Sequence, residues 1–337
     1  MKNKTAHYQF KKSLFEIHDD ELNESLDEYQ VLVKVKWVGI CGSDVSTLEI
    51  DFLDEIVLGH EWVGEIISLG SKVTGFKPGD KVTSGNKIKC GHCENCLSQK
   101  GECQNLYLLT ANHGMLKEYA VFPMGGLIKL PENSNKNSTL FEIIAVAENV
   151  WMKSHEIIKT SQNKILIMGC GLLGLSMGLV LQREGISFEI IDIDSARVKR
   201  AKALNFSARS LNKAVLDESF KDHFQLVIDA TGDHLGSPGG WKFLDHFGAN
   251  EFYGIILAKY VHDVPLKTFR LFSKQANLSW IQGCTNESLI KAIESFKNRI
   301  DELGEVLITH TFKLDEVSEA FEVAKDRTLS GRVIVEL

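Results

Sequence analysis

The sequence has no excess of positive charge, no long uninterrupted apolar run and no internal repeat. Its 337 residues carry a formal net charge of −7, which provides no basic surface for nucleic acid. Its longest apolar segment, "ILIMGCGLLGLSMGLVLQ", is interrupted by glycines and ends in "REG", which argues against a membrane span. The start of the chain has no apolar core followed by a small-residue cleavage site, so it does not resemble a signal peptide. These absences predict a cytoplasmic protein of about two domains, with neither nucleic acid nor membrane as a partner.

The seven cysteines are an odd number, and in a reducing cytosol they are more typical of metal ligands, core residues or catalytic thiols than of disulfides. Four of them, Cys90, Cys93, Cys96 and Cys103, follow the spacing Cys-x2-Cys-x2-Cys-x6-Cys in a loop without apolar periodicity. Zinc binds four thiolates in a tetrahedron, and Gly91 permits the tight turn that this spacing needs. A disulfide cluster, an iron–sulfur site and buried thiols are the alternatives. The pattern predicts a structural zinc ion that replaces the core the loop does not have.

A closed site of four sulfurs has no open position for chemistry, so any reaction requires a second site. The fragment "VGICGSDVS" contains Cys41, and "VLGHEWVGE" contains His60 and Glu61. Asp44 is close enough in sequence to Cys41 to orient a ligating histidine as an outer carboxylate. Each of these residues alone is more typical of a core position, but together they predict an open zinc site.

A glycine-rich turn provides evidence of a different kind. Gly169, Gly171 and Gly174, with Leu172 and Leu173 between them, form a G-x-G-x-x-G motif. The motif directly follows the apolar run "ILIM", opens a helical pattern and precedes the second strand "FEIIDID". Glycines at these positions let backbone N–H groups approach a pyrophosphate at a helix N-terminus. The context predicts a dinucleotide site.

Asp192 ends the second strand, where a carboxylate accepts hydrogen bonds from the adenosine ribose and repels a 2′-phosphate. This position favours NAD over NADP as the cofactor. Arg197 lies nearby and Asp194 is an alternative acid, so NADP stays open. The remaining charges of "SARVKRAKAL" are typical of a solvated helix face.

In order and spacing, these fragments resemble the zinc-dependent medium-chain alcohol dehydrogenase superfamily, and most closely its sorbitol (polyol) dehydrogenase branch. The resemblance covers nearly the whole chain and includes "LKEYAVFP", "VIDATG" and "LITHTFKLDEVSEAFEVAKDRTLSGRVIV". It implies an α/β protein with a distorted, GroES-like β-barrel as its catalytic domain, in residues 1–148 completed by 287–337. Residues 149–286, where strand and helix patterns alternate, are expected to form a doubly wound, parallel-sheet Rossmann domain.

The resemblance also implies roles for individual residues. The segment "LFEIIAVAEN" aligns with the family's third ligand of the catalytic zinc and places Glu142 there, with Glu148 as a competing carboxylate. Glu61 is implied to lie beside the zinc or to ligate it transiently, and Ser43 to pass a proton. Ser46 stands where many polyol relatives have histidine, which leaves the polyol assignment open.

The implied reaction is reversible oxidation of a secondary alcohol, polyol or sugar-like, to a ketone. Hydride would pass to NAD in the cleft between the domains, with two zinc ions per chain, in a homodimer or homotetramer. A sugar-phosphate or amino-alcohol dehydrogenase of the same superfamily is the alternative enzyme. A catalytically inactive nucleotide-binding scaffold is the alternative of another class.

Overall fold

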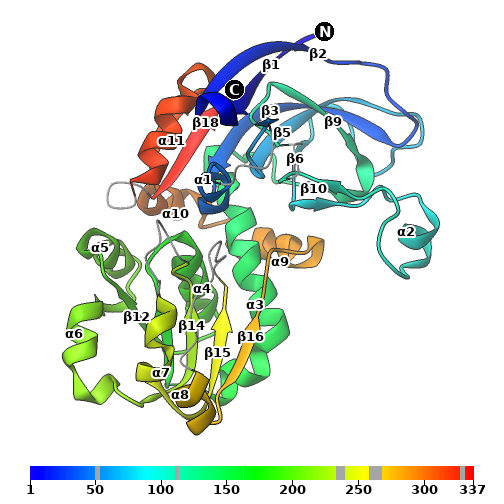
Figure 1. Cartoon of the computed structure of the whole chain (residues 1–337). Helices are drawn as coiled ribbons and strands as arrows, with labels where there is room; N and C mark the ends of the chain where they lie inside the picture. The colour runs from blue at the N-terminus through cyan, green and yellow to red at the C-terminus, as the bar shows by residue number, and fades with distance from the viewer. Residues whose placement is uncertain (50–53, 111–113, 162, 233–239, 258–267, 327–330) are drawn as a thin grey trace. The chain divides into compact units, whose positions relative to one another are not determined.

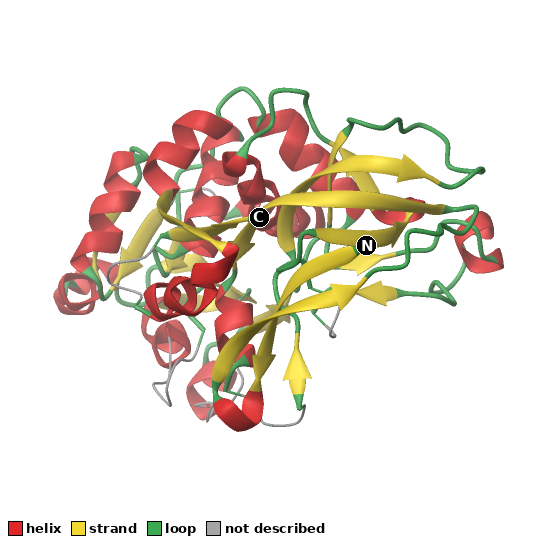
Figure 2. Ribbon diagram, turned by 90° about the horizontal axis from the view of Figure 1, so that it is seen from above, coloured by secondary structure: helices red, strands yellow, loops and turns green. Residues whose placement is uncertain are grey.

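The computed structural model describes the chain except for residues 50–53, 111–113, 162, 233–239, 258–267 and 327–330 (Figure 1). The chain divides into two compact units. Unit 1 combines Met1–Glu142 with Thr285–Leu337, and unit 2 is the continuous stretch Ile143–Cys284. Figure 2 marks the helices and strands of the fold in different colours.

Unit 1 is built mainly from β-strands. A three-stranded sheet has the order β2-β1-β4, a seven-stranded sheet runs β10-β6-β5-β3-β18-β17 with β9 also paired to β3, and β7 pairs with β8. The strands are β1 (Lys2–Gln9), β2 (Leu14–Glu21), β3 (Gln30–Ile40), β4 (Glu55–Ile56), β5 (Glu61–Leu69), β6 (Lys81–Ser84), β7 (Lys87–Ile88), β8 (Tyr107–Leu108), β9 (Tyr119–Pro123), β10 (Leu127–Lys129), β17 (Ile308–Lys313) and β18 (Arg332–Glu336).

The late segment of the chain completes this unit. β18 pairs antiparallel with β3, so that Val333 lies opposite Ile40 and Ile334 lies opposite Gly39. The strand that leads into Cys41 is therefore held by a segment almost three hundred positions later in the sequence. The helices of unit 1 are α1 (Gly42–Thr47), α2 (Glu94–Ser98), α9 (Asn286–Phe296), α10 (Ile300–Leu307) and α11 (Val317–Lys325).

The core of unit 1 follows the alternation of β3. Val31, Val33 and Val35 are completely buried on one face of the strand. Burying a valine side chain contributes roughly 1.5–3 kcal/mol. The rings of Trp62 in β5 and Phe122 in β9 stack with centroids 5.1 Å apart. This packing makes β3 and β5 rigid supports for the residues at their ends.

Unit 2 contains a parallel sheet in the order β13-β12-β11-β14-β15-β16. The first strand is central and the chain winds outward to both sides, which confirms the predicted doubly wound sheet. Strands such as "ILIM" are apolar throughout because helices cover both faces of such a sheet. The strands are β11 (Ile165–Met168), β12 (Glu189–Asp192), β13 (Ser207–Ser210), β14 (Phe224–Asp229), β15 (Gly248–Ile256) and β16 (Asn277–Trp280). The helices are α4 (Leu172–Arg183), α5 (Ser195–Ala203), α6 (Leu211–Leu216), α7 (Leu244–Phe247) and α8 (Thr268–Ser273).

One further helix, α3 (Leu140–Thr160), begins in unit 1 and continues in unit 2. The predicted domain boundary at residue 148 falls inside it. Its 21 residues include several charged side chains. In the described part of the chain, no helix combines the length and the apolar character that a bilayer span requires.

Candidate functional site

The four cysteines of the predicted zinc loop lie together between β7 and β8. Their sulfur atoms are all within 4.8 Å of one another. The Sγ atoms of Cys90 and Cys96 are 3.9 Å apart, and the backbone N–H of Cys90 donates to Sγ of Cys103 at 3.3 Å. Gly91 has a φ of +83°, a conformation that side chains disfavour, and thus forms the turn that the spacing requires. Every cysteine of the chain is a free thiol.

The pKa values of these thiols bear on whether the cluster can bind a metal ion. Hydrogen bonds from the backbone, first of all from Gln104, lower the pKa of Cys93 to about 6. Burial raises the pKa of Cys96 to about 12. Four thiols this close together cannot all lose their protons unless a cation compensates the charge. The donor set and the spacing therefore fit a tetrahedral zinc site.

A second group of donors forms where β3 and β5 lie side by side. Cys41 directly follows β3, while His60 precedes β5 and Glu61 begins it. Because Gly39 lies opposite Glu61 in the antiparallel pair, the two strand ends meet. One ligand atom each of Cys41, His60 and Glu61 lies within 4.8 Å of the others. His60 and Glu61 are buried and Cys41 is half-buried.

The carboxylate of Asp44 contacts both Cys41 and His60 and holds them in position. One of its carboxylate oxygens accepts a hydrogen bond from the backbone N–H of Cys41 at 2.9 Å, and the other lies 3.1 Å from Nδ1 of His60. Burial alone would lower the pKa of His60, but the charges of Asp44 and Cys41 raise it well above its ordinary value. With Nδ1 held by a carboxylate, Nε2 is the nitrogen left for a ligand.

A buried arginine, which the sequence analysis missed, completes the surroundings. Arg332 begins β18, is 1% exposed and forms an ion pair with Glu61. Its Nη1 donates to the backbone oxygen of Ile40 at 2.7 Å. The available signal was a single arginine at the start of the apolar run "RVIV", because a charge inside an apolar strand requires a buried partner.

The three carboxylates considered as the third zinc ligand have different environments. Glu61 belongs to the cluster of ligand atoms, and Glu142, 5% exposed in the first turn of α3, does not. Burial lowers the pKa of Arg332, but the charges of Glu61 and Glu142 outweigh it and raise the pKa. Glu148 is completely buried and binds Arg183 through two contacts, one of them 3.1 Å long. Glu148 is thus occupied elsewhere.

The cluster fits a catalytic metal ion. A thiol, an imidazole and a carboxylate are the three protein ligands of an open zinc site. Oε2 of Glu61 is paired with Arg332, and within the described residues the other carboxylate oxygen, Oε1, has no hydrogen-bond partner. Ser43 is half-buried two positions after Cys41, whereas the hydroxyl of Ser46 donates to Gly42 of its own helix at 3.0 Å.

The glycine turn of unit 2 has the geometry of a phosphate-binding loop. Gly169 has a φ of +102°. A Cβ added at Gly174 would lie 1.8 Å from the carbonyl oxygen of Gly169, so the helix can approach the strand only with glycine there. Around Gly171 there is open space within 4 Å of such a Cβ. Leu172 and Leu173 begin α4, whose free N–H groups and dipole favour an anion at this point.

The two acids at the end of β12 have separate tasks. The carboxylate of Asp192 accepts hydrogen bonds from the N–H groups of Cys170 at 2.7 Å and of Asp194 at 2.9 Å. Asp194 instead caps α5, where its side chain accepts from the N–H groups of Ala196 and Arg197. Nη1 of Arg197 lies 3.9 Å from Asp192. Asp192 is therefore the acid beside the glycine turn, and the residues fit a bound dinucleotide.

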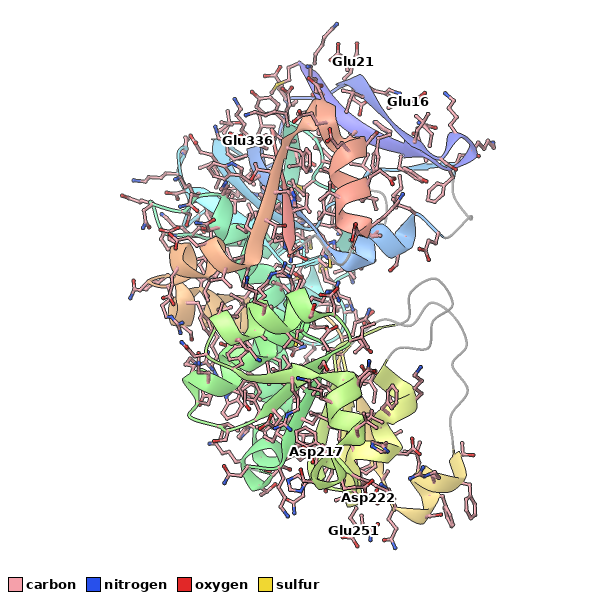
Figure 3. All side chains as sticks on the ribbon, turned by 90° about the vertical axis from the view of Figure 1, so that its left-hand side faces the viewer. Glu16, Glu21, Asp217, Asp222, Glu251 and Glu336 are labelled. Carbon is pink, nitrogen blue, oxygen red and sulfur yellow. The ribbon has the colours of Figure 1, made fainter. Side chains whose placement is uncertain are left out.

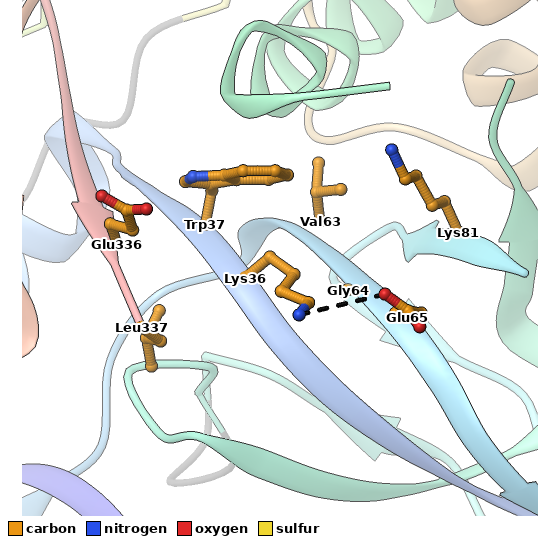
Figure 4. Close-up of a pocket in the computed structure, with 8 residues that line it drawn as sticks. All are labelled: Lys36, Trp37, Val63, Gly64, Glu65, Lys81, Glu336 and Leu337. Atoms are coloured by element: carbon orange, nitrogen blue, oxygen red, sulfur yellow. Dashed lines mark ion pairs between the residues drawn. The ribbon is translucent and has the colours of Figure 1, made fainter. Parts of the chain in front are cut away.

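A surface pocket of unit 1 lies apart from these groups (Figure 4). An ion pair of 3.9 Å between Lys36 and Glu65 crosses it. Its lining consists of Lys36, Trp37, Val63, Gly64, Glu65, Lys81, Glu336 and Leu337. It contains none of the predicted ligands or cofactor residues.

Comparison with known proteins agrees with this geometry. Residues 27–132 match the alcohol dehydrogenase GroES-like domain family. L-threonine 3-dehydrogenase of Vibrio vulnificus strain YJ016 is 26% identical over 328 residues, which cover 92% of each chain. The enzyme of the same name from Salmonella paratyphi B is 26% identical over 322 residues, covering 90% of this chain and 91% of the relative.

Solved structures show the same fold at lower identity. An alcohol dehydrogenase from Escherichia coli CFT073 in complex with NADH has a TM-score of 0.83 at 23% identity, with both chains fully covered. Galactitol-1-phosphate dehydrogenase from Escherichia coli has a TM-score of 0.81 at 20% identity, covering 99% of this chain and 100% of its own. The predicted GroES-like and parallel-sheet architecture and the predicted oxidoreductase class are both confirmed. The predicted resemblance to the zinc-dependent medium-chain alcohol dehydrogenase superfamily is thus confirmed as a similarity that extends over 92% of the chain.

Proposed function

We propose that the protein oxidises a secondary alcohol of polyol or sugar-like type to a ketone, reversibly, with NAD as the hydride acceptor. One observation carries this proposal. The same chain holds an open donor set, Cys41, His60 and Glu61, and a glycine turn that is followed by Asp192. A metal site without the turn would indicate a hydrolase as readily as a dehydrogenase, and the turn without the metal site would indicate only nucleotide binding.

Two zinc ions per chain belong to the proposal. The four-cysteine loop would hold one, and Cys41, His60 and Glu61 would hold the other. The second ion, when bound, supplies Lewis acidity to the substrate oxygen. Asp44 keeps the His60 ring in the tautomer that leaves Nε2 available, and Ser43 accepts the proton of the substrate hydroxyl and passes it toward solvent.

Unit 2 would position the cofactor. The N–H groups at the start of α4 bind the pyrophosphate, and Gly171 lets it approach the backbone. Asp192 accepts hydrogen bonds from the adenosine ribose, and its charge repels the 2′-phosphate of NADP. When bound there, the cofactor would supply the hydride-accepting chemistry.

The substrate is tested by measuring NADH absorbance with panels of secondary alcohols and polyols, sugar phosphates and amino alcohols. Threonine is included because the curated relatives carry its name, and galactitol 1-phosphate because a structural relative does. We expect turnover with a polyol or simple secondary alcohol. Turnover only with an amino alcohol or a sugar phosphate would establish the alternative enzyme. NAD binding without turnover on any panel would contradict the proposal and favour a nucleotide-binding scaffold.

A cytoplasmic location also stays a proposal. All seven cysteines are free thiols, which supports a compartment in which thiols remain reduced.

The first prediction concerns the cysteine loop. Cys96→Ser should remove roughly one zinc equivalent per chain, because three thiolates hold the ion less tightly than four. The melting temperature should fall by roughly 5 °C or more, since each kcal/mol corresponds to about 2–4 °C in a domain of this size. Cys284→Ser, outside both clusters, is the control. Full metal content and unchanged melting of Cys96→Ser would rule out the loop as a zinc site.

The second prediction separates the candidate carboxylates. Glu61→Gln should lose roughly one zinc equivalent and at least about 100-fold in kcat/KM, because the metal supplies several kcal/mol of transition-state stabilisation. Glu142→Gln and Glu148→Gln should retain both ions. Metal analysis and kinetics on the three variants check this. Loss of zinc from Glu142→Gln, with both ions retained by Glu61→Gln, would reassign the third ligand to Glu142.

The third prediction concerns cofactor choice. Asp192→Ala should weaken NAD binding roughly tenfold, the loss of about one good hydrogen bond to a charged group, and should relax discrimination against NADP. Asp194→Ala should instead cost about 1 kcal/mol of stability, through loss of the α5 cap, and leave the cofactor preference unchanged. Fluorescence titrations with both cofactors give the two affinities. A preference of the unmodified enzyme for NADP would contradict the proposed role of Asp192.

The fourth prediction concerns assembly into a homodimer or homotetramer. β16 is an edge strand of the parallel sheet, and Trp280 at its end is 61% exposed. On α8, Phe269 and Phe272 are 79% and 80% exposed. Apolar surface of this kind marks an interaction site. Light scattering should give two or four times the chain mass of 37.7 kDa, and Trp280→Lys should shift the protein toward monomer. A monomeric unmodified protein would contradict this.

A further inference from the structure

A third group of metal-type ligands lies on the N-terminal sheet of unit 1, on elements separate from the two groups already described. One ligand atom each of His7, His18 and Asp20 lies within 4.8 Å of the others. His7 is in β1, and the other two residues are in β2. Figure 3 shows the strand pair, with Glu16 and Glu21 labelled on β2.

The register of the hairpin brings these residues to one face. Thr5 lies opposite His18, Asn3 opposite Asp20, and His7 opposite Glu16. Residues directly opposite each other in an antiparallel pair point to the same side, and so do residues two apart in one strand. His7 and His18 are therefore diagonal neighbours on the face that also carries Asp20.

The distances suit a single ion. Nε2 of His7 lies 2.9 Å from a carboxylate oxygen of Asp20. The rings of His7 and His18 stack with centroids 4.7 Å apart and an angle of 25° between their planes. In a tetrahedral zinc site with bonds of about 2.0–2.2 Å, neighbouring donors are roughly 3.3–3.5 Å apart. The His18 side chain, 41% exposed, can rotate to close the remaining gap.

Each imidazole also faces a second carboxylate. Nδ1 of His7 is buried, has no hydrogen-bond partner within the described residues, and lies 3.7 Å from a carboxylate oxygen of Glu55 in β4. Nε2 of His18 lies 3.5 Å from Glu16. Metal-bound histidines characteristically direct their second nitrogen at a carboxylate, which fixes the tautomer and raises the basicity of the ligating nitrogen. Glu55 and Glu16 occupy these outer positions.

The face of the hairpin that carries His7, His18 and Asp20 is negatively charged. Asp20, Glu16 and Glu55 contribute three carboxylates to this face. Two lysines oppose them: Lys12 binds Glu16 at 2.7 Å, and the charge of Lys117 interacts with that of Asp20. The carboxylates therefore outnumber the lysines, and this balance of charge favours a cation.

We propose that His7, His18 and Asp20 form a third metal site, for a divalent ion of the zinc or copper type. Two imidazoles and one carboxylate are the donors that such ions prefer over magnesium or calcium. Nε2 of His7, Nδ1 of His18 and an oxygen of Asp20 are the ligands, and water completes the coordination. The ion joins β1 to β2, which is the edge strand of its sheet.

The test uses tag-free protein that carries its resident zinc. One equivalent of Cu²⁺ is added at neutral pH, and the electron paramagnetic resonance spectrum is recorded. We expect hyperfine structure from two nitrogen ligands, and His7→Gln and His18→Gln should each abolish that pattern. His223→Gln, which changes an exposed histidine of unit 2, is the matched control and should leave the spectrum unchanged.

A second measurement uses Zn²⁺ alone. After equilibrium dialysis against micromolar Zn²⁺, the unmodified protein should hold roughly one equivalent more than Asp20→Asn or His18→Gln, with equal melting temperatures in chelator showing that all of them are folded. Equal metal content in the unmodified protein and both variants would overturn the proposal. So would the absence of any additional ion, which would reduce the cluster to an ion pair between His7 and Asp20. Neither result depends on dehydrogenase activity.

Discussion

The ion pair between Glu61 and Arg332 is the interaction on which the candidate metal site of unit 1 depends. Both side chains are at most 1% exposed, and removing two such charges from water costs several kcal/mol for each ion before any attraction is counted. Arg332 is satisfied in part by the backbone oxygen of Ile40, the residue before Cys41. The pair therefore links the last strand of the sheet to both segments that supply the metal-type donors.

The pair also orients the site. Arg332 holds the carboxylate of Glu61 in place from one side. Asp44 likewise holds the His60 ring through Nδ1. A thiol, an imidazole and a carboxylate are thus held by neighbours that are not themselves ligands, and this shell of neighbours sets the donor geometry before any ion arrives.

The four-cysteine loop differs from the rest of unit 1 in what can stabilise it. Its only buried cluster consists of the cysteines themselves, and its helix α2 has five residues, too few to be stable alone. An ordinary apolar core cannot form there. The proposed zinc ion, bound by the four thiolates, would take the place of that core.

Features that depend only on neighbouring residues in the chain can be predicted from the sequence. The glycine turn, the cysteine spacing and the alternation of strands with helices are local patterns, because each follows from backbone geometry over a few positions. Arg332 was not predictable in this way, since its partner Glu61 lies on a strand far away in the sequence. The grouping of His7 with His18 depends on the register of a hairpin, where a shift by one residue would turn them to opposite faces.

The position of β18 has a consequence for how the protein forms as it is synthesised. Unit 2 is one continuous stretch, and its strands and helices can assemble as soon as that stretch has emerged from the ribosome. Unit 1 cannot, because β3 remains without its β18 neighbour until the chain has been made through unit 2 and on to Glu336. During that interval Glu61 has no Arg332 to bind and stays in water. Of the two units, the one whose strands begin to emerge earlier is therefore the later to reach its final form.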